Sequence, residues 1–102
     1  MLDSRYNYKM NSYLLTLVLK ADLEEKVREE LLKSVKGKVV SEKGKISKED
    51  AWGVRDLAYP IKKQAKGYYV HFELETDPAV ARTIDKTLKV EEDILRYLLV
   101  RS

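Results

Sequence analysis

The chain of 102 residues contains no cysteine and only one histidine, His71. Because the chain has no cysteine, disulfides and cysteine metal sites are excluded, and one imidazole cannot form a histidine cluster. The four glycines, at positions 37, 44, 53 and 67, are too scattered to form a phosphate-binding loop. The longest apolar run, residues 13–19, is interrupted by Thr16 and is far too short to span a bilayer. We therefore expect no membrane span, no metal or other cofactor and no small-molecule substrate.

The composition is that of a globular protein, with 44% apolar and 36% charged residues. The net charge is only +3, but it is unevenly placed. Residues 33–66 hold ten basic and four acidic residues, a balance of +6, whereas the remainder holds ten basic and thirteen acidic residues, a balance of −3. This pattern indicates either a face that binds a polyanion such as nucleic acid or a lysine-rich loop region.

The first half of the chain predicts one strand and one helix. Residues 1–11 are polar and lack periodicity, and we expect a flexible N-terminal extension there, followed by a single domain at 12–102. Leucines at 15, 17 and 19 predict a strand over 13–19. Asp22 is the expected N-cap of an amphipathic helix with apolar positions 23, 27 and 31. That helix is expected to end near Val35, because Gly37 is a stop signal. Val39 and Val40 are then expected to begin a strand, with a break at 43–45.

The second half predicts two strands, a helix and a final strand. Residues 52–63 alternate only partly, and Pro60 among them is typical of an edge strand. Residues 68–75 alternate clearly, with Tyr68, Val70, Phe72 and Leu74 on one face. Asp77 is the expected N-cap of a helix with Pro78 at its first position, followed by an apolar stripe at 80, 81, 84 and 88. Residues 94–100 are apolar on both sides, which is typical of a central strand.

The resulting order is strand, helix, strand, strand, helix, strand (βαββαβ). Two strand–helix–strand halves of this kind form a four-stranded antiparallel sheet with both helices on one face, which is a ferredoxin-like α+β fold. No catalytic constellation accompanies it, because His71 stands alone and the carboxylates fall on helix faces and turns. We therefore expect a protein that is not an enzyme.

Residues 66–72, Lys-Gly-Tyr-Tyr-Val-His-Phe, approach the strand signature of the RNA-recognition motif, in which exposed aromatic rings stack on bases. The run is one residue short, so the spacing and facing of its aromatic residues differ from that signature. We favour the interpretation that Tyr68 and Phe72 face the core. A stand-alone module that binds single-stranded RNA remains the alternative function.

Residues 49–63 carry a more specific pattern, in which Trp52-Gly53-Val54-Arg55 leads into Leu57-Ala58-Tyr59-Pro60-Ile61. This segment resembles the signature of the bacterial small-subunit ribosomal protein six family, and Gly67-Tyr68 matches the strand start that follows it there. The resemblance covers roughly residues 13–101, with the family's order of elements throughout.

The resemblance implies a cytoplasmic, ribosome-associated structural protein of the small subunit, with a ferredoxin-like fold and no catalytic activity. It implies binding to 16S rRNA together with small-subunit ribosomal protein eighteen. The RNA-binding residues that it implies are basic: Arg55, Lys62, Lys63 and Lys66. Three aromatic residues are candidate contacts to the partner or to RNA: Tyr13, Trp52 and Tyr59. Trp52 can equally be buried against the sheet, and Tyr59 can cap the core.

Overall fold

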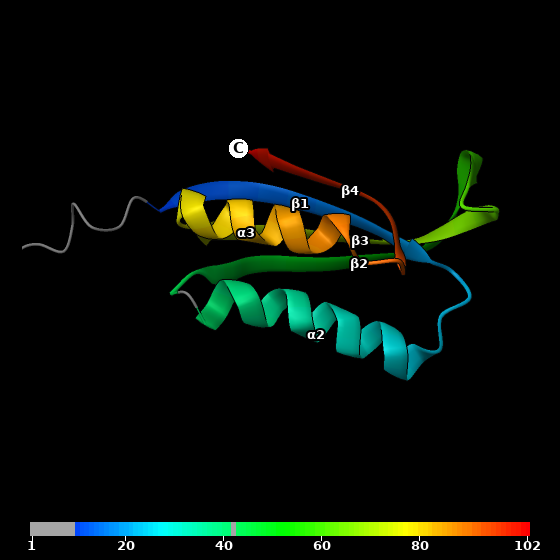
Figure 1. Ribbon diagram of the computed structural model, residues 1–102, viewed down its shortest axis with the longest axis horizontal. Helices are drawn as coiled ribbons and strands as arrows, with labels where there is room; N and C mark the ends of the chain where they lie inside the picture. The colour runs from blue at the N-terminus through cyan, green and yellow to red at the C-terminus, as the bar shows by residue number, and fades with distance from the viewer. Residues whose placement is uncertain (1–9, 42) are drawn as a thin grey trace, which may run out of the picture.

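The computed structural model describes residues 10–41 and 43–102 and contains four strands and two helices (Figure 1). Their order along the chain is β1 (Asn11–Lys20), α2 (Glu25–Ser41), β2 (Lys45–Ile61), β3 (Gln64–Thr76), α3 (Pro78–Lys89) and β4 (Ile94–Arg101). The strands form one antiparallel sheet in the order β2-β3-β1-β4. The predicted ferredoxin-like α+β fold is confirmed.

The hydrophobic core lies between the sheet and the two helices. Alternate residues of β1 and β3 enter it, so Leu15, Leu17 and Leu19 pack beside Val70, Phe72 and Leu74. The helices contribute Val35, Val39, Ala81, Ile84 and Leu88. The predicted strand faces are therefore confirmed, with Phe72 only 1% exposed. Among residues 10–41 and 43–102, no helix covers the opposite face of the sheet, which we call the open face.

Helix α2 is longer than the sequence predicts and begins later. It starts at Glu25, and the amide of Arg28 donates to the carbonyl of Glu24, so the prediction of Asp22 as N-cap is wrong. The helix then runs through Gly37 to Ser41, so the expected strand start at Val39 and Val40 is also wrong.

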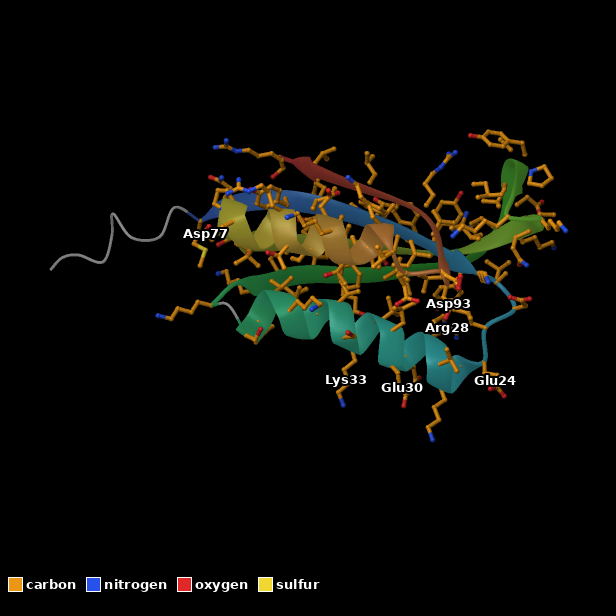
Figure 2. The ribbon with its side chains drawn as sticks, viewed as in Figure 1. Glu24, Arg28, Glu30, Lys33, Asp77 and Asp93 are labelled. Carbon is orange, nitrogen blue, oxygen red and sulfur yellow. The ribbon has the colours of Figure 1, made fainter. Side chains whose placement is uncertain are left out.

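The physical reason lies in the burial on either side of Gly37. Val35 and Val39 are buried, and burying a valine contributes about 1.5–3 kcal/mol, whereas glycine inside a helix costs about 1 kcal/mol. The buried stripe is also rotated from the expected one, because Val27 is exposed while Leu31 and Leu32 pack against the core. Glu24, Glu30 and Lys33 project away from the sheet (Figure 2).

Helix α3 follows the prediction closely. The Asp77 carboxylate accepts a hydrogen bond of 2.7 Å from the amide of Ala79, and Pro78 occupies the first turn. The predicted apolar stripe faces the core through Ala81, Ile84 and Leu88.

Strand β4 lies at one edge of the sheet, which corrects the expectation of a central strand. Its apolar residues on the open face remain exposed, with Leu98 at 60% and Val100 at 39%. Alternation cannot distinguish a strand covered by neighbours from one whose apolar outer face remains uncovered. Strand β2, at the other edge, contains Pro60 as predicted.

The hairpin of β2 and β3 extends beyond the rest of the sheet, and its end curls toward the side of β4 (Figure 1). The pairing register shifts between Ala51 and Gly53, and Gly53 has a φ of 83°. Such a bulge with a left-handed glycine bends the strand that carries it. The bend brings the hairpin end within reach of β4.

Residues 1–9 lie outside the described part of the chain. The expected N-terminal extension at 1–11 and the domain at 12–102 therefore stay predictions, although β1 begins at Asn11.

Candidate functional site

The end of the β2–β3 hairpin carries all four basic residues that the sequence suggested for RNA binding. In the β2–β3 ladder, Asp56 lies opposite Lys66 and Arg55 lies opposite Gly67. Ile61 and Gln64 are the last paired residues before the two-residue turn Lys62-Lys63. The four residues thus lie on one protruding element, because the expected antiparallel pairing of neighbouring strands places them at the same hairpin end.

The turn itself has an unusual backbone for its residues. Lys62 and Lys63 have φ angles of 50° and 65°. Two consecutive left-handed residues are characteristic of a type I′ hairpin turn, which favours Asn-Gly. Side chains other than glycine, asparagine and aspartate adopt this region at a cost of roughly 1–2 kcal/mol per residue. The hairpin therefore keeps two lysines at its tip at some cost in stability.

The four basic side chains differ in their surroundings. The Lys62 ammonium donates to the carbonyls of Glu92 and Ile94, both at 3.5 Å, so it faces the start of β4. Lys66 lies 3.7 Å from the Asp56 carboxylate in an exposed ion pair, and the Arg55 Nε donates to the Trp52 carbonyl at 3.3 Å. Lys63 is exposed at the tip. Lys63 is thus the most directly presented charge of the four.

Arg96 of β4 joins this region, although nothing in its local sequence pointed to it. Its guanidinium donates to the Tyr59 hydroxyl and lies 5.4 Å from the centre of the Tyr59 ring. Tyr59 is 56% exposed, so it clamps the hairpin end to β4 and does not cap the core. The two residues are 37 positions apart, and only the bend of the hairpin brings them together.

Trp52 lies on the open face of the sheet and is held flat by two ring contacts. Its centroid is 6.2 Å from that of Tyr69 and 5.6 Å from that of His71, each with an interplanar angle of 16°. Its indole N–H donates to the Asp50 carboxylate at 3.2 Å, and the His71 Nδ1 lies 3.0 Å from the Thr16 hydroxyl. At 44% exposure, Trp52 is a fixed surface ring and not a core residue.

A hollow of about 250 Å³ adjoins this aromatic group on the open face. Its lining combines aromatic, aliphatic and polar side chains: Thr16, Val18, Trp52, Tyr69, Arg96, Tyr97 and Leu98. Leu98 and Val100 continue the apolar surface along β4. An exposed apolar surface with a fixed aromatic ring is typical of a protein-binding face.

Tyr13, the third aromatic candidate, is a core residue with 9% exposure. It lines a shallow depression beside α3, together with Pro78, Ala81 and Leu99. Only a small part of its ring is therefore available to a partner.

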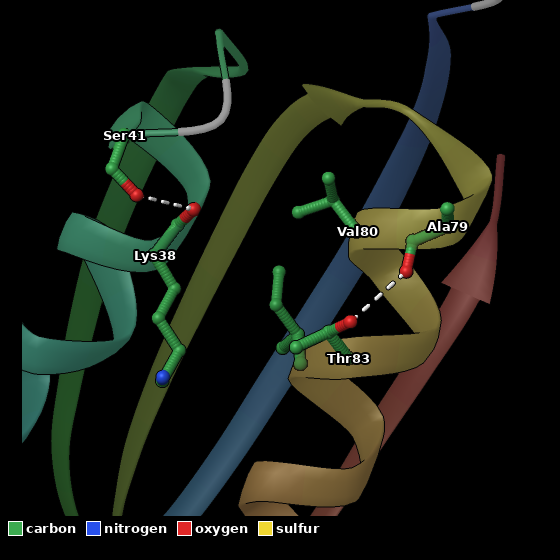
Figure 3. A pocket seen from close by; sticks show the side chains of 6 residues that line it. Lys38, Ser41, Ala79, Val80 and Thr83 are labelled. Carbon is green, nitrogen blue, oxygen red and sulfur yellow. Dashed lines mark hydrogen bonds between the residues drawn. The ribbon is translucent and has the colours of Figure 1, made fainter.

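A groove of about 330 Å³ lies on the helix side, between the end of α2 and the start of α3 (Figure 3). Lys38 reaches into it, while the hydroxyls of Ser41 and Thr83 donate to the carbonyls of Lys38 and Ala79 within their own helices. Both hydroxyls are thus engaged with backbone, and the groove offers one cation above apolar Val80 and Ile84.

The residues that the structure describes include no cluster of histidine, aspartate and glutamate able to hold a metal ion. Over the same residues, no helix is long and apolar enough to cross a membrane.

One titratable pair connects α3 to β4. The Tyr97 hydroxyl donates to the Asp85 carboxylate at 2.7 Å. Burial raises the pKa of Tyr97 to about 12, and the hydrogen bond to Asp85 adds to the rise. The same hydrogen bond is the main cause that lowers the pKa of the Asp85 carboxyl. This pair fixes α3 against β4 behind the open face.

Comparison with known proteins assigns these features to a family. Residues 12–101 match the sequence profile described as Ribosomal protein S6. The chain is 39% identical over 93 residues to small ribosomal subunit protein bS6 of Caldanaerobacter subterraneus, covering 91% of this chain and 98% of that one. It is 41% identical over 91 residues to the same protein of Clostridioides difficile, covering 89% and 98%. The crystal structure of 30S ribosomal protein S6 from Thermotoga maritima superposes with a TM-score of 0.85 at 28% identity, covering 92% of this chain and 89% of that one.

Proposed function

The chain belongs to the ribosomal protein S6 family, and from that premise we propose that it binds 16S rRNA together with small-subunit ribosomal protein eighteen. As a member of this family it is a structural constituent of the small ribosomal subunit in the cytoplasm, and it is not an enzyme. Two separate surfaces support the proposal, one for each partner.

The hairpin end is the proposed rRNA surface. It protrudes from the domain and carries Arg55, Lys62, Lys63 and Lys66, so it can enter a groove or follow a phosphate ridge. Asp56 pairs with Lys66, and Lys62 faces backbone carbonyls, so only part of this charge is immediately available. Such sparse charge supports weak binding to naked RNA and a need for a second protein.

The open face is the proposed surface for protein eighteen, and the fixed Trp52 ring is the observation that carries this assignment. A large aromatic residue held by Tyr69, His71 and Asp50 loses little conformational freedom on binding. The adjoining hollow and the exposed Leu98 extend the apolar area around it. A protein surface with apolar side chains is the chemistry that fits this face.

The alternative, a stand-alone binder of single-stranded RNA, is favoured by one observation, the aromatic rings of Tyr69, Trp52 and His71 on the open face. Base stacking on such rings contributes about 1–3 kcal/mol per base. Glu73 and Glu75, which alternate with the core residues of β3, lie on the same face and oppose binding to a polyanion. The two functions therefore predict different partners for Trp52: a protein surface in the first case and an RNA base in the second.

Calorimetric titrations of a Trp52→Ala variant separate these functions. The proposal predicts that affinity for protein eighteen falls by about thirtyfold, the equivalent of an anchor of roughly 2 kcal/mol, while affinity for RNA alone is unchanged. Loss of RNA affinity in the absence of the partner, with the thermal unfolding midpoint unchanged, would instead establish the stand-alone module. Val90→Ala is the matched control, because Val90 is also an exposed apolar residue (79%) but follows α3, outside the open face.

A further inference from the structure

Strand β4 has one free edge, and its chemistry differs from that of the edge formed by β2. No strand of the described residues pairs with the outer side of β4. Natural edge strands are usually protected by charges, proline or bulges, and β2 has all three. The β4 sequence, Ile-Leu-Arg-Tyr-Leu-Leu-Val-Arg, has no proline and no glycine, and only two charges.

The hydrogen bonds to β1 determine which backbone groups this edge offers. The amide of Ser102 donates to the carbonyl of Ser12 at 2.9 Å, directly beyond the pair of Tyr13 with Arg101. Hydrogen-bonded pairs alternate along an antiparallel ladder, so the residues at 96, 98 and 100 bond to β1. The N–H and C=O groups of Tyr97, Leu99 and Arg101 consequently point to the free edge.

We infer that two copies of the free protein pair through β4 into a two-fold symmetric dimer centred on Leu98. Antiparallel pairing about this residue places Tyr97 of each copy opposite Leu99 of the other, and these are residues whose backbone groups are available. Arg96 then faces Val100, and Arg101 faces Leu95, so no two like charges are opposed.

Leu98 supplies the apolar part of the contact. It is 60% exposed, and on the two-fold axis it packs against its own copy, with Val100 next to it on the open face. The hairpin end limits the contact, because Lys62 faces the carbonyls of Glu92 and Ile94 at the start of the strand. A single pair of edge strands buries little area, so the dimer is weak and forms at high concentration.

This inference goes beyond the proposed function, since it concerns the protein before assembly. The dimer covers Leu98, which also adjoins the hollow on the open face. Self-association and binding of a protein partner there exclude one another. At high protein concentration a second copy of the chain thus covers this edge, and a partner that binds at Leu98 displaces it.

Cysteine cross-linking tests both the dimer and its register, because the natural chain contains no cysteine. In a Leu98→Cys variant the two thiols lie across the axis in a pair without hydrogen bonds, with Cα atoms about 4.5 Å apart, which suits a disulfide. With oxidised glutathione as the oxidant, we expect the disulfide-linked dimer to form at least about tenfold faster than in Val100→Cys or Val90→Cys. Equal rates in the three variants would overturn the inference, because they indicate random collision.

A second measurement uses the unmodified protein and requires no folding of a variant. Amide NMR spectra between about 10 µM and 1 mM cover the range expected of a weak dimer. We expect concentration-dependent shifts at Tyr97, Leu99 and Arg101 and smaller ones at Leu98 and Val100, whose amides already bond to β1. Spectra that do not change with concentration would overturn the inference. Leu98→Lys, at an exposed position, should abolish the concentration dependence.

Discussion

Replacing Lys62 by asparagine and Lys63 by glycine should make the protein more stable and a weaker RNA binder. The two lysines adopt left-handed conformations at the hairpin tip, and Asn-Gly is the pair that this turn type favours. Relief of the backbone strain contributes roughly 1–2 kcal/mol for each residue. Glycine offsets about 0.5–1 kcal/mol of that gain, because it increases the conformational entropy of the unfolded chain. The two hydrogen bonds that the Lys62 ammonium donates are long, at 3.5 Å, and therefore weak, so their removal costs little.

The net expectation is a gain of about 1–3 kcal/mol in the free energy of unfolding, and each kcal/mol raises the unfolding midpoint of a domain of this size by about 4–8 °C. Denaturant titration and thermal melts measure it. At the same time, each phosphate contact removed should reduce the slope of log affinity against log salt by about 0.7–0.9. Filter binding to 16S rRNA in the presence of protein eighteen, over a series of salt concentrations, measures this slope.

The matched control is Lys33→Gln with Lys86→Gln, which removes the same charge from exposed positions on the helices. This control should leave the salt slope nearly unchanged. A less stable Asn-Gly variant would refute the explanation of the turn. A slope that falls equally in the control would show that net charge, and not the hairpin, governs binding.

Three further outcomes follow from the fold. Gly37→Ala should stabilise the protein by about 0.5–1 kcal/mol in denaturant titrations, because this exposed helical position has no atom within 4 Å of an added Cβ; a loss of stability would show that the helix does not continue through it. Phe72→Ala should cost about 3–5 kcal/mol, since the ring is 1% exposed, and a cost under 1 kcal/mol would contradict its place in the core. The raised pKa of Tyr97 stabilises the folded state below pH 10, and this contribution is lost as pH rises toward about 12. The lowered pKa of Asp85 stabilises the folded state above the ordinary carboxyl pKa, and this contribution is lost as pH falls through the lowered pKa. In Tyr97→Phe, the free energy of unfolding should therefore change less with pH at both the acidic and the alkaline ends of the range.

The elements that could be predicted from the sequence are those whose signals are local. The leucines of β1, the alternation of β3 and the Asp77-Pro78 start of α3 each fix a face or a boundary through nearest neighbours. The end of α2 could not be predicted in this way, because burial of Val39 against the sheet outweighs the helix-breaking tendency of Gly37. Burial of that kind depends on the tertiary structure.

The same distinction between local signals and tertiary contacts applies to the candidate site. The basic residues of the hairpin were accessible from the sequence because neighbouring antiparallel strands bring them together. Arg96 was not, since its contact with Tyr59 depends on the bend at Gly53. The edge position of β4 was also missed, because an apolar strand with an uncovered face has the same sequence pattern as a central one. The exposed Leu98 follows from that topology.

We propose that this constituent of the small subunit binds 16S rRNA cooperatively with protein eighteen. A calorimetric titration of 16S rRNA with this protein, alone and in the presence of saturating protein eighteen, tests this cooperativity. We expect weak binding to the naked RNA and an affinity at least about tenfold higher when the partner is present. Equal affinities with and without the partner would contradict it.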